Sequence, residues 1–301
     1  MPSITKRAVL RWTLRIAGGL VALIVLVVAA VYTISEFRFR KRYEVPSHTI
    51  VATADSATAA RGEHIVKSRG CMACHGKNLV GKVEMEDPMF GRLAGPNLTN
   101  GGRGAELSDA DWERAVRHGV KRDGTPLFIM PAFEHTGLSD EDIGAIAAYA
   151  RSLPASTNAP PKSYAGPIIR ALFIAGAVPV VSAEMVDHKK SHPAHVDVEP
   201  TAKYGAYLGA MCAGCHGPTM SGGKIPGGPP EWKPAANLTP TGMGHYNEET
   251  FIRAMRTGVR PDGSKIDEQM PWKDIGQMDD TELRALYAYL RTLTPRMYGN
   301  R

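Results

Sequence analysis

The hydrophobic residues of this 301-residue chain first gather in one long run near its start. Ile16–Ile34 is a stretch of nineteen residues without a charge. As a helix rising about 1.5 Å per residue it would be ~28 Å long, close to the hydrocarbon thickness of a bilayer. We therefore predict that residues 1–42 form a membrane anchor with basic flanks. The alternative is a secretory signal cleaved after Ala30.

Beyond this run the apolar residues recur at the spacing of amphipathic helices. Leu283, Leu286 and Leu290 would share one buried face, and a similar face repeats earlier in the chain. Strand-like alternation is lacking, so the fold class predicted is all-α. The helices predicted in this way lie at 57–70, from the cap Ser108 onward, 139–153, 202–211, from the cap Asn247 onward, and 279–293.

An internal repeat organises the rest of the chain. Segments recur at an offset of about 140 residues; they are CMACH and CAGCH, GPNLTN and AANLTP, RAVRHGVKRDG and RAMRTGVRPDG, MP and MP, and AYARSLP and AYLRTLTP. The repeat predicts one domain used twice, at 55–155 and 201–296, with a linker at 156–200.

The linker contains an apolar segment, residues 168–183. Arg170 and Pro179 interrupt it, and sixteen residues are short for a membrane span. We expect an amphipathic segment lying across both domains or on the membrane surface.

The formal charge of +6 is unevenly distributed. Residues 1–42 carry +7, so the remaining 259 residues carry −1. The basic residues thus belong to the membrane end, and the charge gives no argument for nucleic-acid binding.

The four cysteines form two Cys-x-x-Cys pairs, Cys71/Cys74 and Cys212/Cys215. Such a pair is typical of a zinc site, a redox-active dithiol or a c-type haem attachment. Here a histidine follows each pair at once, His75 and His216. Zinc ribbons and dithiols do not need that histidine, whereas haem c uses the two thiols for thioethers and the imidazole as an iron ligand. The sequence therefore predicts two covalently bound haem c groups.

On these motifs the chain resembles the class I cytochromes c, as a membrane-anchored tandem di-haem protein. The resemblance covers about residues 55–155 and 200–296. It implies a helix before each motif, a C-terminal helix crossing it, and a methionine on the far side of each iron. Haem c is attached on the outer side of the bacterial inner membrane, so a single-pass protein with periplasmic haem domains is expected.

Met130 and Met270 are the predicted distal iron ligands. Each precedes a proline at the same place in the repeat, and a thioether stabilises reduced iron. Met85, Met89, Met243 and Met297 have no such partners, and we expect them to be packing residues.

Asn97 and Asn237, in the repeated NLT, are candidates for haem binding through the propionates; turn formation is the equal alternative. Pro96 precedes Asn97 and matches the family's proline near the proximal histidine. The second copy has Ala236 there, which puts the hydrogen bond to His216 in doubt. His118 and His135 are expected at the surface, and His188, His192 and His195 in a solvated linker.

The function predicted is single-electron transfer, without catalysis by this chain itself. The expected partners are a dehydrogenase, a quinol-oxidising complex, a terminal oxidase or a soluble cytochrome, with no nucleic acid. A di-haem peroxidase would instead need one iron with an open position. A haem-bearing subunit that docks a dehydrogenase to the membrane is a third reading.

Overall fold

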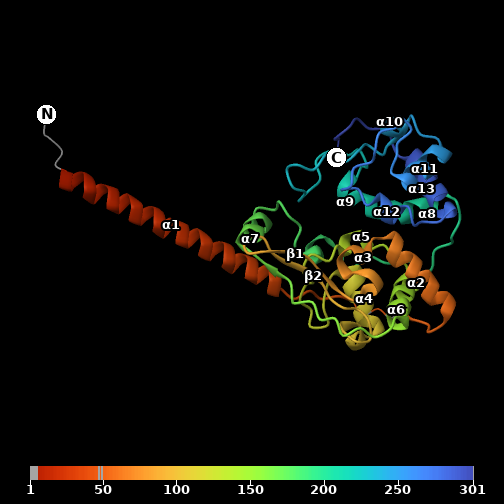
Figure 1. Cartoon of the computed structure of the whole chain (residues 1–301), viewed down its shortest axis with the longest axis horizontal. Helices are drawn as coiled ribbons and strands as arrows, with labels where there is room; N and C mark the ends of the chain where they lie inside the picture. The colour runs from red at the N-terminus through yellow and green to blue at the C-terminus, as the bar shows by residue number, and fades with distance from the viewer. Residues whose placement is uncertain (1–5, 47, 49, 301) are drawn as a thin grey trace.

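The computed structural model describes residues 6–46, 48 and 50–300. Its first element is the long helix α1 (Lys6–Arg40), which projects from a globular body made of two helical groups (Figure 1). Within the described residues, α1 is the one helix long and apolar enough to cross a membrane, and its apolar window is not buried against the rest of the chain. The predicted N-terminal apolar helix is therefore present.

The first helical group contains the predicted helices of the first repeat. Ser108 caps α4 through a capping box with Asp111, as predicted. Ser139, predicted as the first residue of its helix, is the N-cap of α6. The elements are α2 (Ser56–Ser68), α3 (Cys71–His75), η1 (Lys77–Leu79), η2 (Arg103–Glu106), α4 (Asp109–His118), α5 (Ala132–His135) and α6 (Asp140–Ser152).

The second group repeats this plan. Asn247 caps α11, although its reciprocal partner is Thr250 and not a glutamate. The elements are α8 (Ala202–Gly209), η4 (Ala210–Cys212), α9 (Ala213–His216), α10 (Pro240–Met243), α11 (Glu248–Thr257), α12 (Trp272–Ile275) and α13 (Asp280–Thr292).

In each group the first and last helices cross at a glycine. A Cβ on Gly62 of α2 would lie 1.9 Å from the carbonyl oxygen of Ala145 in α6. A Cβ on Gly205 of α8 would lie equally close to the carbonyl oxygen of Ala285 in α13. Only glycine permits this approach of two backbones, so the repeat preserves the crossing itself.

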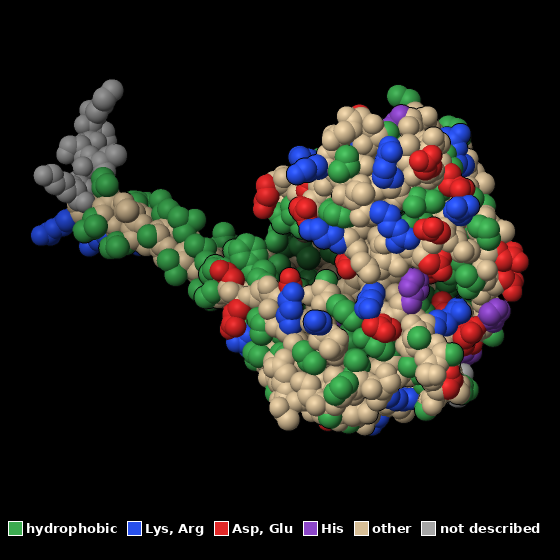
Figure 2. All heavy atoms as spheres, turned by 45° about the vertical axis from the view of Figure 1, so that its right-hand side comes forward, with side chains coloured by type: hydrophobic (Ala, Val, Ile, Leu, Met, Phe, Trp, Pro, Cys, Tyr) green, Lys and Arg blue, Asp and Glu red, His purple; other side chains and the backbone are tan. Residues whose placement is uncertain are grey.

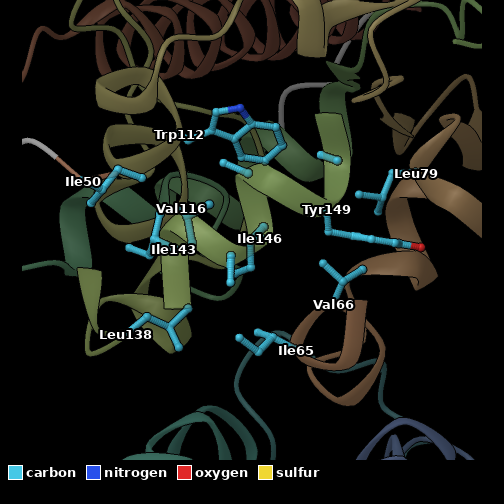
Figure 3. Packing of buried hydrophobic residues seen from close by; sticks show 13 residues of the cluster. Ile50, Ile65, Val66, Leu79, Trp112, Val116, Leu138, Ile143, Ile146 and Tyr149 are labelled. Carbon is cyan, nitrogen blue, oxygen red and sulfur yellow. The ribbon is translucent and has the colours of Figure 1, made fainter. Parts of the chain in front are cut away.

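The hydrophobic core of the first group lies between α2, α4 and α6 (Figure 3). Trp112 and Val116 of α4 pack with Ile143 and Ile146 of α6, and Val66 of α2 contributes to the same cluster. The second group has a corresponding cluster built on Phe251, Met255, Leu283, Leu286 and Leu290. Each helical group therefore encloses its own core.

A small sheet departs from the predicted all-α class. β1 (Lys82–Asp87), β2 (Gly91–Gly95) and β3 (Tyr164–Ala165) pair antiparallel in the order β1-β2-β3. Val83 and Met85 alternate with Lys82, Glu84 and Glu86, a short strand signal that our sequence reading missed. Side chains on both faces of β1 are largely exposed, so neither face shows the run of buried apolar residues that makes a strand easy to recognise in a sequence.

The apolar linker folds back onto α1. It forms α7 (Pro167–Ile174) and η3 (Ser182–Met185). Phe173, Val180 and Val181 are buried with Val120 of the first domain, and Phe39 from the end of α1 packs against them. The apolar segment thus joins the first domain to α1. Its residues 177–179 also lie beside Gly227 of the second domain, so the segment contacts both domains, as expected.

Candidate functional site

Both cysteine motifs lie in short helical turns directly after a longer helix. Cys71–His75 is α3, and Gly70 before it adopts a left-handed conformation at φ 69° that favours glycine. In the second copy, α8 continues through η4 into α9, which ends at His216. Because the motif is one turn of helix, the two cysteines and the histidine of each copy extend from a compact backbone segment.

A backbone carbonyl orients each motif histidine. His75 Nδ1 lies 3.1 Å from the Pro96 oxygen, and His216 Nδ1 lies 2.7 Å from the Ala236 oxygen. Such a bond makes Nδ1 the protonated nitrogen and leaves Nε2 for a metal. The doubt raised by Ala236 was wrong, because the acceptor is a main-chain oxygen that alanine supplies as well as proline does.

The cysteines have the surroundings of inert thiols. Burial raises the pKa of Cys71 to about 11 and that of Cys212 to about 12. A redox-active dithiol needs the opposite shift, toward the thiolate. Burial also lowers the pKa of His75, which keeps its imidazole neutral as iron ligation requires.

The cysteine motifs do not form a zinc cluster in the described part of the chain. There, the one group of three or more potential ligand atoms within 4.8 Å of one another is His64, Asp279 and Glu282. That group lies outside both cysteine motifs. A tetrahedral zinc site would instead bring the thiols and imidazoles together.

A cavity of about 580 Å³ brings Met130 together with the first motif. Cys71, Cys74 and His75 line it along with Met130, and this volume is in the range of cofactor pockets. Most of the other lining side chains are apolar; they include Val66, Leu79, Trp112, Val116, Leu138 and Ile146. An apolar cavity with two thiols, one oriented imidazole and one thioether fits a haem c.

Met130 and Met270 occupy equivalent backbone positions. Pro131 and Pro271 are the N-caps of α5 and α12, and the next residue's N–H donates to the carbonyl of each methionine, at 2.8 and 2.7 Å. Met270 packs against the core of the second domain. Ligation of iron by both methionines remains a prediction.

Asn97 and Asn237 are committed to their loops. The Asn97 amide donates to the carbonyls of Ser156 and Asn158, at 2.6 and 2.9 Å, and its oxygen accepts from Thr99. Asn237 likewise donates to Arg296 and accepts from Thr239. This arrangement fits the turn interpretation, and a propionate would have to replace one of these bonds.

Basic residues at the cavity were missed in the sequence reading. Arg103, Lys121 and Arg122 all line it. Lys121 and its counterpart Arg260 lie in the repeated RAVRHGVKRDG and RAMRTGVRPDG segments, which was the available signal. Arg122 pairs with Asp111, whereas no hydrogen bond or ion pair of the Lys121 ammonium to a carboxylate occurs among the described residues.

The histidines outside the motifs correct two expectations. His118 and His135 are buried, 2% and 5% exposed, and not at the surface. His118 Nδ1 lies 3.0 Å from His188 Nδ1, so the linker covers it and His188 is not simply solvated. His192 also packs its ring beside His118. His195 is exposed and pairs with Glu141.

The second domain completes the wall of the cavity. Met211, Pro271 and Asp274 line it from that side. Met211 precedes Cys212, and Pro271 follows Met270. The second domain therefore borders the first cavity with the two segments that carry its own predicted cofactor residues.

The two globular parts match known families. Residues 57–149 match the family described as "Cytochrome C oxidase, cbb3-type, subunit III", and residues 202–294 match "Cytochrome c". These matches place Cys71/Cys74 and Cys212/Cys215 in two cytochrome c domains, as haem-binding motifs.

Individual relatives are similar to the chain over different shares of their length. The cytochrome c subunit of alcohol dehydrogenase (quinone) from Gluconobacter oxydans is 27% identical over 80% of this chain and 55% of its own. The diheme cytochrome c-type protein of Cereibacter sphaeroides is 25% identical over 77% of this chain and 85% of its own. The fructose dehydrogenase cytochrome subunit of Gluconobacter japonicus is 34% identical over 31% of this chain and 21% of its own. The chain thus spans about half the length of the alcohol dehydrogenase subunit.

Proposed function

We propose, on the premise that residues 57–149 and 202–294 are two cytochrome c domains, that the chain is the electron-transfer subunit of a membrane-bound dehydrogenase. Covalent haem supplies one-electron chemistry when bound. The chain's own residues hold and orient the two haems and exclude water from them. The donor would be a dehydrogenase subunit, and the acceptor a quinone-linked oxidase or a further cytochrome.

The observation that carries this proposal is the shared wall of the first cavity. Because Met211 and Pro271 border the space lined by Cys71 and His75, the two cofactors would be close neighbours. Electrons accepted at one domain could then leave through the other without diffusion of the protein. Arg103 and Lys121 would pair with the propionate carboxylates of the first haem. Met130 would be the distal ligand of the first haem, and Met270 that of the second.

The relatives support a dehydrogenase as partner. The matched subunits from Gluconobacter belong, by name, to alcohol and fructose dehydrogenases. We propose that α1 spans the bacterial inner membrane with the haem domains in the periplasm, where haem c is attached. Full-length protein should then remain with membranes after a carbonate wash.

The decisive experiment is purification of the full chain from its native membrane. We expect a large dehydrogenase subunit to accompany it, and the substrate of that subunit to reduce both haems. Rapid peroxide turnover by the isolated chain, with a high-spin signal, would instead support the peroxidase alternative. A chain that purifies alone, with haems that no dehydrogenase reduces, would refute the proposal.

A further inference from the structure

Two large hydrophobic side chains are exposed at the tip of the β1–β2 hairpin. Met89 is 51% exposed and Phe90 is 42% exposed, so the expectation that Met89 packs inside the domain is wrong. The turn is nevertheless well formed, because the Asp87 carboxylate accepts from the backbone N–H of Met89 and Phe90 at 2.8 and 2.9 Å. An ordered turn thus presents two apolar side chains outward, where polar residues are usual.

The hairpin tip is bonded to the beginning of α7. Gly166 N–H donates to the Phe90 carbonyl at 2.9 Å, and Ile168 N–H donates to the Met89 carbonyl at 3.0 Å. Tyr164, just before this point, is also 43% exposed. The position of the tip therefore follows from the position of α7.

α7 lies along the last turns of α1 and in the same direction. Arg170 donates to Ser35 at 2.7 Å and pairs with Glu36 at 3.1 Å. Three residues later, Phe173 stacks on Phe39, with ring centroids 5.2 Å apart. Because later residues of α7 meet later residues of α1, the first turn of α7 points back toward the apolar run.

This register places the hairpin tip at the end of the apolar run. The charge-free stretch ends at Ile34, one residue before the contact of Ser35 with Arg170. The start of α7 lies three residues before Arg170, about 4.5 Å further back along α1. In Figure 2 hydrophobic side chains continue from the helix onto the neighbouring part of the globular body.

We propose that the hairpin tip, Met89 and Phe90, and the first turn of α7 form a second membrane contact beside α1. The occupant of this surface is the lipid bilayer at its boundary between headgroups and acyl chains, where aromatic side chains are favoured. This surface is continuous with α1, so it meets the bilayer where α1 leaves it. The inference rests on the proposed function in one respect, that α1 is embedded in lipid. Arg40 ends α1, and Lys41 and Arg42 follow it a few residues beyond Ser35, where their charges would attract anionic headgroups.

The second domain offers a natural comparison. Its corresponding segment has no hairpin, and a single bridge, Gly223 to Ala235, replaces the β1–β2 pairing. Tyr298 is 57% exposed, and the N–H of the next residue, Gly299, donates to the Ser221 carbonyl of the second domain, so Tyr298 provides an exposed aromatic control outside the proposed surface. Trp12, within α1 and 64% exposed, provides the positive control.

The test uses the full-length, haem-loaded chain in nanodiscs of phosphatidylcholine and phosphatidylglycerol. Phe90, Tyr298 or Trp12 is replaced, one at a time, by the photoactivatable amino acid benzoylphenylalanine, and lipid adducts are identified by mass spectrometry. We expect lipid adducts from the Phe90 and Trp12 variants and no lipid adducts from the Tyr298 variant. Haem content and absorption spectra confirm that each variant is folded.

The controls separate this inference from the proposed function. Adducts at Trp12 without adducts at Phe90 would refute the second contact while leaving the anchor in place. Absence of adducts at Trp12 would refute both. If Phe90 cross-linked to another protein chain in native membranes and not to lipid, the surface would be a protein interface and the lipid assignment would be wrong.

Discussion

His64 of the first domain and Glu282 of the second lie 2.6 Å apart, from Nε2 to Oε2, and this pair joins the two haem domains. Glu282 is 6% exposed, and its carboxylate also accepts from the backbone of Asp279. A second link lies nearby, where the Tyr207 hydroxyl donates to Asp142 and accepts from the backbone of Ser139. The domains are therefore docked through buried polar groups as well as through the shared cavity wall.

The stability of this docking should depend on pH. The hydrogen bond to Glu282 raises the pKa of His64 above its ordinary value. Its contribution is therefore fully present below the unfolded pKa of about 6.5, and it is lost as pH rises through the folded pKa. We expect the thermal unfolding midpoint to fall between about pH 6 and about pH 8, and to fall less in His64→Gln, which still donates but does not titrate. Equal pH dependence in both proteins would contradict this role of His64.

Substitution of the crossing glycines should destabilise one domain at a time. An alanine at Gly62 or Gly205 would force the backbones of the paired helices apart, at a cost of roughly 1–3 kcal/mol. Gly137→Ala is the matched control, because nothing lies within 4 Å of its added Cβ. Denaturant unfolding of the haem-loaded protein, followed by haem absorption, measures both. An unchanged free energy of unfolding in Gly62→Ala would show that α2 and α6 cross at a larger distance than in this structure.

Replacement of a distal methionine should alter one haem and spare the other. Met130→Ala is expected to open one iron to cyanide or carbon monoxide, and Met130→His to keep it low-spin with a lower potential. The same changes at Met270 should affect the second haem. Met297→Ala is the control, since Met297 is 74% exposed. Unchanged spectra in Met130→Ala would leave Met130 as a packing residue.

Both haems should stay attached after denaturation. Acid–acetone extraction is expected to leave all the haem on the protein, because each pair of thiols forms thioethers. Replacing Cys71 and Cys74 by alanine should remove half of the covalent haem, and replacing Cys212 and Cys215 should remove the other half. Release of free haem from the unaltered protein would refute covalent attachment at one or both motifs.

Local signals allowed most of the helices to be predicted. Ser108, Ser139 and Asn247 each satisfy a backbone N–H at the start of a helix, and that requirement is visible within four residues of sequence. The cysteine motifs are equally local, since adjacency alone places His75 and His216 beside the thiols. The repeat then showed which features belong to the domain and which to one copy only.

Features that depend on distant contacts were harder to predict. His118 is buried because the linker returns across it and brings His188 to its Nδ1, a contact between residues 70 positions apart. The bond from His216 to the Ala236 carbonyl shows the converse case. There the replacement of proline by alanine suggested that the hydrogen bond to His216 was lost. The bond is kept, because its acceptor is the backbone carbonyl, which alanine also has.

The joint between α1 and the first domain determines how partners can reach the haems. Phe39 is packed into the apolar cluster of the linker, and Arg38 pairs with Glu184, so the helix ends firmly packed against the globular body and not in a loose tether. A flexible linker would let the haem domains rotate freely relative to α1 and meet partners in many orientations. With α1 in a membrane, this joint confines the encounter to two dimensions and fixes the face that is presented. Electron exchange would then be governed by lateral diffusion and by how partners stand in the same bilayer.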